Sequence, residues 1–219
     1  MQLKGYISIG VRVVDRSEDL KILVRAEHML GTKRRLQGKA GVLGVILGVP
    51  VLSLWLAGSA QAATYYVNDS STNGDVYCTS TGATVNTGLT PASPKASLQE
   101  IADSYVLSGG DTVYVDTGSY TGQTTSINRS GSAGNFIVIQ GSTNFAAGGT
   151  VFDRQNPGAN VINVGGQYVR FRHLTVQGGR YGFYQANNCE FEWVRMIGND
   201  YGHWSPGGWG TNNVFAHCV

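Results

Sequence analysis

Short apolar runs alternate with clusters of Gly, Ser, Thr and Asn between residues 63 and 219. In several runs every second residue is apolar, as in Thr-Val-Tyr-Val at 112–115. This alternation is typical of a strand that buries one face. Gly is abundant, with 31 in the chain, and charged residues are few. The pattern predicts an all-β domain with many tight turns.

One segment has the period of a helix instead. Leu98, Ile101, Ala102 and Tyr105 follow the spacing i, i+3, i+4, i+7, which places them on one helical face. We therefore expect a helix within 94–107, ended by the two glycines at 109–110. Residues 111–115 return to strand alternation directly afterwards.

An internal repeat of 20 residues gives the strongest signal. Residues 168–178 align with 188–198, so that Phe171 falls on Phe191, and residues 181–184 align with 201–204. A third copy at 212–219 aligns with 187–194 at an offset of 25. Such a repeat predicts a solenoid, because one coil cannot bury its apolar face alone and coils must stack.

The apolar positions change parity within each coil. They fall at 169 and 171 and then at 174 and 176, which predicts a bend at His173 and, one coil later, at Trp193. We expect a third strand to complete each coil.

Stacked coils place equivalent residues about 4.8 Å apart. The 20-residue offset therefore predicts outward pairs between Arg170 and Glu190 and between Arg172 and Glu192. The offset of 25 predicts that His217 continues the second column beside Glu192.

Three further segments resemble the N-terminal cap of the pectate-lyase-like superfamily. They are 65–68 (Tyr-Tyr-Val-Asn), 88–94 with Gly88, Pro91 and Pro94, and 110–120 with its Gly-Asp-Thr-Val-Tyr-Val run. The resemblance covers 63–219. It implies a right-handed parallel β-helix with an N-terminal capping helix, a fold that hosts lyases, hydrolases, epimerases, phage tailspikes and adhesins.

The resemblance also implies what catalysis would require. Its catalytic members use acidic residues of central coils to hold calcium, and a Lys or Arg to remove a proton beside a uronic carboxylate. Lys95 is the only Lys in 63–219 and lies in the cap, and the Asp residues show no Asp-x-Asp spacing. We identify no catalytic residue and no cofactor, and we expect catalytic coils and any calcium site to lie outside this chain.

Charge divides sharply along the chain. Residues 1–62 hold nine Lys or Arg and four Asp or Glu, a net charge of +5, whereas residues 63–219 hold seven and ten, a net charge of −3. The basic character therefore belongs to the first segment. A nucleic-acid partner is not expected for the remainder, since phosphate binding needs a basic surface.

Residues 29–62 have the parts of a signal peptide. A basic cluster at 33–39 precedes an apolar run at 40–56, and Ala60-Gln61-Ala62 is a small-x-small cleavage site. The alternative is a membrane anchor, since the run is long enough to span a bilayer, but three glycines and Pro50 interrupt it. We expect a secreted or cell-surface protein that begins at Ala63 and meets the membrane only before cleavage.

The same reading divides the chain into four parts. They are a non-native extension at 1–28, with Met29 as the true start, the signal peptide at 29–62, a cap and first strand at 63–122, and β-helix coils at 123–219. Val219 is expected at the position of Val194 in the preceding coil, within a strand and without a cap. A solenoid needs capped ends, so we expect the natural protein to continue.

The three cysteines do not indicate a disulfide framework. An odd count leaves one of Cys78, Cys189 and Cys218 unpaired, and their spacing does not suggest a zinc site. Cys189 takes an inward position in the repeat, so we expect a buried free thiol.

Aromatic residues supply candidates for binding. The third coil is longer, and the excess maps to 205–210, a loop that carries Trp209 next to Trp204. Tyr184 lies one coil before Trp204, so the two are expected to form an outward aromatic ladder that contacts sugar rings. The alternative is that the tryptophans only cover the loop base and the apolar coil edge.

Arg172 and Arg180 are candidates for binding a carboxylate. The alternative for both is a solvated surface arginine, paired in one case with Glu192. His203 replaces Phe183 of the preceding coil, so we expect it to point inward. We expect the protein to bind, and in the finer hypothesis to cleave, an extracellular acidic polysaccharide. The alternative is a non-enzymatic surface adhesin or structural module.

Overall fold

The computed structural model describes residues 10–12, 23–25, 61–205 and 212–219. The chain forms two compact units, Met1–Trp55 and Leu56–Val219. In the first unit, β1 (Gly10–Arg12) pairs antiparallel with β2 (Leu23–Arg25). Most of the expected signal segment and the loop that carries Trp209 lie outside the described residues. No helix in the described ranges is long and apolar enough to cross a bilayer.

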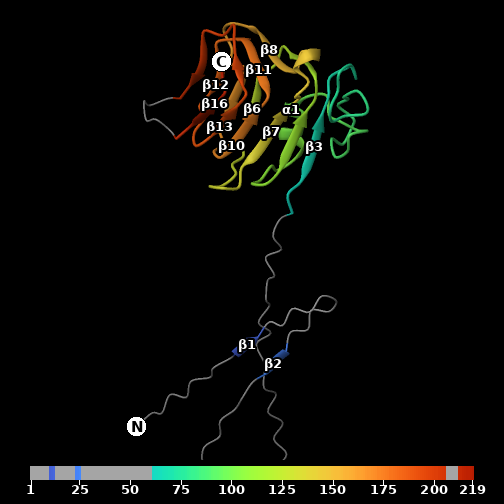
Figure 1. The fold of residues 1–219 in the computed structure, drawn as a ribbon, viewed down its shortest axis with the longest axis vertical. Coiled ribbons are helices and arrows are strands. Elements are labelled where there is room, and N and C mark those ends of the chain that lie inside the picture. Colours follow the sequence, from blue (N-terminus) through green and yellow to red (C-terminus); the bar gives the residue numbers. More distant parts are fainter. Residues whose placement is uncertain (1–9, 13–22, 26–60, 206–211) are drawn as a thin grey trace, which may run out of the picture. The chain divides into compact units, whose positions relative to one another are not determined.

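The second unit is a parallel β-helix, as the repeat predicts (Figure 1). Its strands visit three parallel sheets in turn, and each strand pairs with its equivalents in neighbouring coils. Sheet 1 consists of β3 (Thr64–Val67), β4 (Thr112–Val115), β7 (Ile137–Gly141), β10 (Val169–Arg172), β13 (Glu190–Glu192) and β16 (Val214–Ala216). Sheet 2 consists of β5 (Gly118–Thr121), β8 (Thr150–Asn156), β11 (Leu174–Gly179) and β14 (Arg195–Met196). Sheet 3 consists of β6 (Thr125–Ile127), β9 (Ile162–Val164), β12 (Tyr181–Tyr184) and β15 (Tyr201–Trp204).

The inward side chains form columns along the coil stack. Phe171 pairs with Phe191 in register, and their ring centroids lie 5.5 Å apart at 11°. Phe215 continues the column 4.7 Å from Phe191. Phe171 and Phe191 are fully buried, so the 20-residue repeat does specify a shared apolar core.

The structure corrects the offset of the third copy from 25 to 24. Phe191 pairs with Phe215, and Glu192 pairs with Ala216 rather than with His217. A slip of one residue would exchange inward and outward side chains along the strand. The offset of 24 keeps Phe215 in the aromatic column, and packing thus decides the register.

The offset of 24 also applies to the last residue, Val219. The Val219 amide donates to Val194 O, and the Met196 amide donates to Val219 O. In a parallel pair this pattern places Val219 beside Arg195, not at the expected position of Val194.

The bends between sheets 1 and 2 lie where the change of parity predicts them. His173, Trp193 and His217 all have left-handed backbone, with φ of 53°, 58° and 55°. Their rings stack along the turn, 6.3 Å from His173 to Trp193 and 4.2 Å from Trp193 to His217. His217 therefore belongs to this turn column and not to the ion-pair column.

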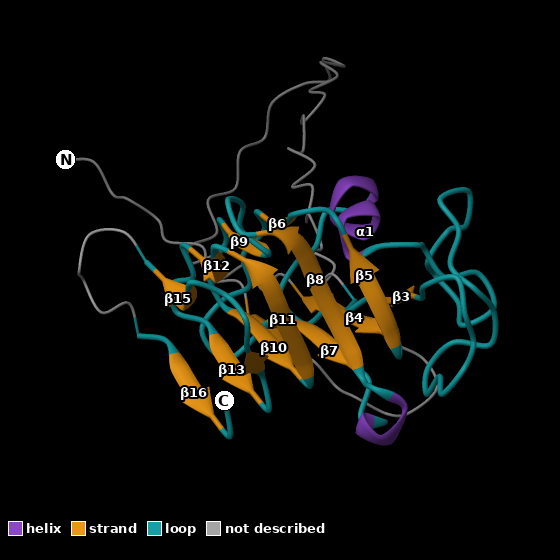
Figure 2. Cartoon of the chain, turned by 90° about the horizontal axis from the view of Figure 1, so that it is seen from above, coloured by secondary structure: helices purple, strands orange, loops and turns teal. Residues whose placement is uncertain are grey.

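The helix α1 (Leu98–Ser104) is shorter than expected. Ser97 caps it, with its hydroxyl accepting a hydrogen bond from the Glu100 amide, and Tyr105 ends it in extended backbone. Leu98 and Ile101 are fully buried. The helix contacts β3 and β6 (Figure 2), and so covers the core of the first coil.

A long loop between β3 and α1 is fixed to the coils by Asp116. This buried carboxylate accepts hydrogen bonds from the amides of Val76, Tyr77, Cys78 and Thr117 at 2.6–2.8 Å. The loop therefore lies in a defined position over sheet 1. All three cysteines are free thiols, and Cys189 is buried as expected.

Candidate functional site

The outer face of sheet 3 carries two pairs of stacked aromatic side chains. Tyr184 of β12 and Trp204 of β15 are register partners, with ring centroids 4.9 Å apart at 10°. Tyr181 and Tyr201 form the second pair, 5.1 Å apart at 24°. Tyr181 links the pairs, lying 5.3 Å from Tyr184 and 5.4 Å from Trp204. We call these four residues the aromatic patch.

The predicted ladder of Tyr184 and Trp204 is thus present, and the structure adds Tyr181 and Tyr201. Tyr201 is 54% exposed, whereas the other three rings are half-buried. Sequence reasoning aligned the two tyrosines but gave them no role. Their recurrence at the same offset is the signal that finds them.

Gly182 brings the two coils together beneath the patch. A Cβ at this position would lie 2.5 Å from Gly202 O, so any larger residue would push the coils apart. On the inner side, Phe183 pairs with His203, as the repeat predicts. Burial lowers the pKa of His203, and its ring packs against Phe215 at 5.4 Å. His203 is therefore a half-buried packing residue.

Arg180 lies at the border of the aromatic patch. Its guanidinium carbon is 5.1 Å from the centre of the Tyr181 ring, a cation–π distance. The side chain is exposed. Ion pairs among the described residues involve Arg170 and Arg172 rather than Arg180.

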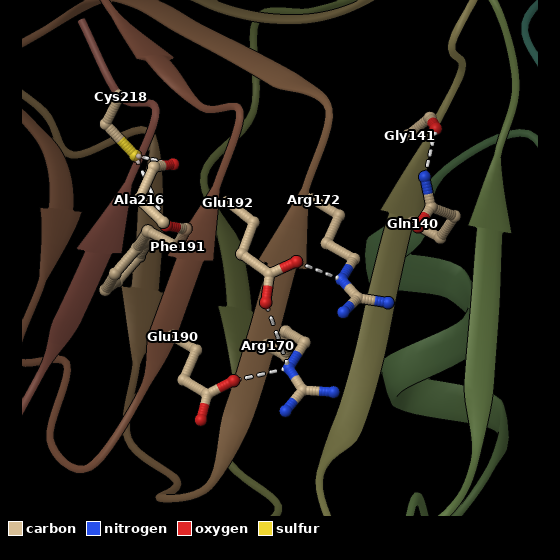
Figure 3. Close-up of polar contacts among 9 residues, drawn as sticks. All are labelled: Gln140, Gly141, Arg170, Arg172, Glu190, Phe191, Glu192, Ala216 and Cys218. Carbon is tan, nitrogen blue, oxygen red and sulfur yellow. Dashed lines mark hydrogen bonds and ion pairs between the residues drawn. The ribbon is translucent and has the colours of Figure 1, made fainter.

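Arg172 lies on a different sheet from the patch. On β10 of sheet 1, its Nε donates to Glu192 at 2.7 Å, while Arg170 Nε donates to Glu190 at 2.5 Å (Figure 3). Both predicted cross-coil pairs are present. The candidate residues therefore divide into two groups, with Tyr184, Trp204 and Arg180 together on sheet 3 and Arg172 apart. Trp209 lies outside the described residues.

A groove of about 430 Å³ lies beside Arg172 on the outer face of sheet 1. Sequence reasoning missed it because one wall comes from the loop that Asp116 holds, far from β10 in sequence. Tyr77 of this loop lies against Tyr114 of β4 and forms that wall. The groove is lined by Tyr77, Thr112, Tyr114, Val138, Gln140, Thr143, Arg172 and His173.

The acidic residues of the cap do not fit a calcium site. The Asp116 and Asp69 oxygens accept backbone amides. Burial raises the pKa of Asp75 to about 6, opposed by the Asn68 hydrogen bond and assisted by the charges of Asp116 and Asp69. Within the described ranges, no three His, Cys, Asp or Glu side chains gather to hold a metal ion.

No protein-family profile and no curated protein matches this sequence. Two crystal structures resemble the chain. One is an alginate lyase from Paenibacillus sp. str. FPU-7, with 21% identity and a TM-score of 0.40 over 55% of this chain and 40% of that protein. The other is pectate lyase Pel9A, with 17% identity and a TM-score of 0.42 over 72% of this chain and 48% of that protein.

The chain spans less than half of the length of either matched protein. The parallel β-helix fold rests on the strand order and register described above.

Proposed function

We propose that this protein binds an acidic polysaccharide outside the cell, with the aromatic patch of sheet 3 as the contact surface. The observation that carries the proposal is the register stacking of Tyr184 on Trp204, beside the Tyr181–Tyr201 pair. Four partly exposed aromatic rings on one short stretch of two neighbouring strands are more than the core of the coil requires, because the core lies on the other side of the sheet.

The patch suits a sugar chain for two reasons. A sugar ring has an apolar face of C–H groups, and packing this face on Tyr or Trp removes apolar surface from water while hydroxyl groups stay solvated. Arg180 adds a positive charge at the border of the patch. A guanidinium binds a carboxylate through two parallel hydrogen bonds, which favours a uronic over a neutral sugar.

Binding to polyuronate oligomers tests the proposal. Trp204→Ala is expected to weaken binding of oligogalacturonate or oligoalginate at least tenfold, which is about 1.4 kcal/mol, as measured by titration calorimetry. Arg180→Gln is expected to weaken binding of the acidic oligomers but not of a neutral oligomer of equal length.

Trp193→Ala is the matched control. Trp193 is also stacked and is 50% exposed, but it lies on the turn between sheets 1 and 2. We expect this variant to bind as the natural chain does. Unchanged affinity of the Trp204 variant, or an equal loss in both variants, contradicts the assignment of the patch.

Export is a separate part of the proposal. We propose that residues 29–62 are a signal peptide removed between Ala62 and Ala63, which places the mature protein outside the cell. Gln61 and Ala62 are exposed, which suits access of a peptidase. N-terminal sequencing of the exported protein is expected to give Ala63 as its first residue, and retention of residues 29–62 contradicts this.

Cleavage of the bound polysaccharide is tested by a separate assay. Full-length protein is incubated with polygalacturonate or alginate and calcium, and the ultraviolet absorbance of the unsaturated product is followed. If product forms, the protein is a lyase. Binding without product supports the alternative function, that of a non-enzymatic adhesin or structural module.

A further inference from the structure

The groove on sheet 1 is an open depression between two neighbouring strands and the loop that carries Tyr77. Its floor consists of two register pairs on neighbouring strands, Thr112 with Val138 and Tyr114 with Gln140. Arg172 of the next strand rises at one side, and Tyr77 lies against Tyr114 at 4.5 Å at the other. The volume of about 430 Å³ lies within the range of about 300–1,000 Å³ that is typical of ligand pockets.

The wall that Tyr77 forms is held in place at both ends. Its backbone amide donates to Asp116 at 2.7 Å, and its hydroxyl donates to Gly141 O at 3.1 Å. A ligand would therefore meet a surface that is already formed and would lose little free energy in ordering it.

Arg172 presents its terminal nitrogens to the groove. Its Nε is occupied by Glu192, and this pair fixes the guanidinium in one orientation. The terminal nitrogens point over β7, the strand that carries Gln140 (Figure 3). Burial, followed by the charge of Arg172, lowers the pKa of His173. Arg172 is the permanently charged side chain among the residues that line the groove.

We propose that this groove is a second binding site, separate from the aromatic patch, that accepts a single carboxylated sugar ring. The carboxylate binds the terminal nitrogens of Arg172. The apolar face of the ring packs on the Tyr77 and Tyr114 side, and the hydroxyls bond to Gln140 and Thr143. The site lies on sheet 1 and does not depend on the binding proposed for sheet 3.

Galacturonic acid and galactose form a matched pair of probes, because they differ only in the carboxylate. We expect the full chain to bind galacturonic acid and to bind galactose at least tenfold more weakly, as measured by protein-observed NMR titration. Arg172→Met is expected to lower the affinity for galacturonic acid at least tenfold. Gln140→Leu, which leaves the ion pairs intact, is expected to lower it as well.

Arg170→Met is the control for charge. Arg170 belongs to the same ladder and pairs with Glu190, but it does not line the groove. Equal losses in the Arg170 and Arg172 variants, or no binding of galacturonic acid by the natural chain, overturn the proposal. Trp204→Ala is expected to leave monomer binding unchanged, so failure of this site and failure of the aromatic patch are distinguishable.

A second inference rests on a different observation, at the expected cleavage site. The backbone nitrogen of Ala63 donates to Asp111 Oδ1 at 2.8 Å, and Asp111 is only 3% exposed. The carbonyl of Ala63 accepts from the Thr112 amide at 2.9 Å. The first residue of the expected mature chain is thus fixed to the first coil, with its nitrogen against a buried carboxylate.

We infer that processing creates an ion pair at this point. Hydrolysis of the Ala62–Ala63 amide by water leaves a carboxylate on Ala62 and an α-ammonium group on Ala63. The ammonium then replaces the amide as donor to Asp111, and a charged donor forms the stronger hydrogen bond. This inference rests on the proposed export of the chain, and it makes removal of the signal peptide a step that stabilises the cap.

The test uses the processed protein that the full precursor yields on export. Selective acetylation of its α-amino group is expected to lower the midpoint of urea unfolding. In an Asp111→Asn variant processed in the same way, acetylation is expected to have no effect. Equal shifts in both proteins, or none in either, overturn the inference, whereas a first residue other than Ala63 defeats the proposed cleavage itself.

Discussion

Single buried carboxylates organise the cap, and Asp116 is the most connected of them. It accepts from the amides of Val76, Tyr77, Cys78 and Thr117. Asp116→Ala would leave these donors without their acceptor, so we expect it to lower the free energy of unfolding by about 3 kcal/mol or more, as measured by urea denaturation. Asp200→Ala, at an exposed position, is the control, expected within about 0.5 kcal/mol of the natural chain. Equal stabilities of the two variants contradict the role of Asp116.

Asp75 predicts a pH dependence of opposite sign from that of most carboxylates. Its pKa rises from 3.8 to about 6 on folding, chiefly through burial. The folded chain therefore binds more protons than the unfolded chain between these values, and the contribution of Asp75 to stability falls as pH rises from about 4 to about 6. Asp75→Asn is expected to remove this component and to gain stability relative to the natural chain at pH 7.

Urea unfolding between pH 4 and pH 8 measures the difference between the two proteins. The curves are expected to lie closest near pH 4, to separate as pH rises to about 6, and to run parallel above that. Curves that stay parallel from pH 4 to pH 8 contradict the raised pKa. Asp200→Asn, an exposed control in the same series, is expected to follow the natural chain.

The burial and register of residues inside the repeat are largely predictable from the sequence. The contacts of the turn and cap residues are less predictable. Phe171 and Phe191 are fully buried register partners, as their spacing implies. The shared hydrogen bonds of Asp116 and the contact of Tyr77 with Tyr114 join residues about 40 apart. No periodicity records such contacts, so the groove on sheet 1 is visible only in the folded chain.

At the scale of the strands, ion pairs between neighbouring coils contribute to the register. Glu190→Lys places a like charge opposite Arg170 on β10, so we expect a loss of about 0.5–1 kcal/mol in the free energy of unfolding. The exchanged pair, Arg170→Glu with Glu190→Lys, is expected to recover most of the loss, and salt is expected to reduce both effects. A double variant no more stable than Glu190→Lys alone contradicts a direct pair.

Element boundaries show the limits of a local pattern. The apolar stripe on the helix predicts 94–107, whereas α1 covers Leu98–Ser104. Ser97 fixes the start as a cap. Tyr105 adopts extended backbone, and its hydroxyl donates to Thr87 O at 2.6 Å. The third repeat shows the same limit, since stacking of Phe215 on Phe191 sets the offset to 24.

Across the whole β-helix unit, coil stacking turns positions 20 residues apart into neighbours. This assembles the aromatic patch from β12 and β15, with Arg180 at its border. The same order places Arg172 on sheet 1, because a coil visits its sheets in sequence. Sequence reasoning could identify both arginines as candidates but could not tell that they lie at different sheets.

Tryptophan fluorescence provides the most direct test of the aromatic patch. In a variant that keeps Trp204 and replaces Trp55, Trp193 and Trp209 by Phe, titration with oligogalacturonate is expected to change the Trp204 emission saturably. The midpoint is expected to match the dissociation constant from calorimetry. Binding detected by calorimetry with no change in Trp204 emission would place the sugar elsewhere and contradict the proposed surface.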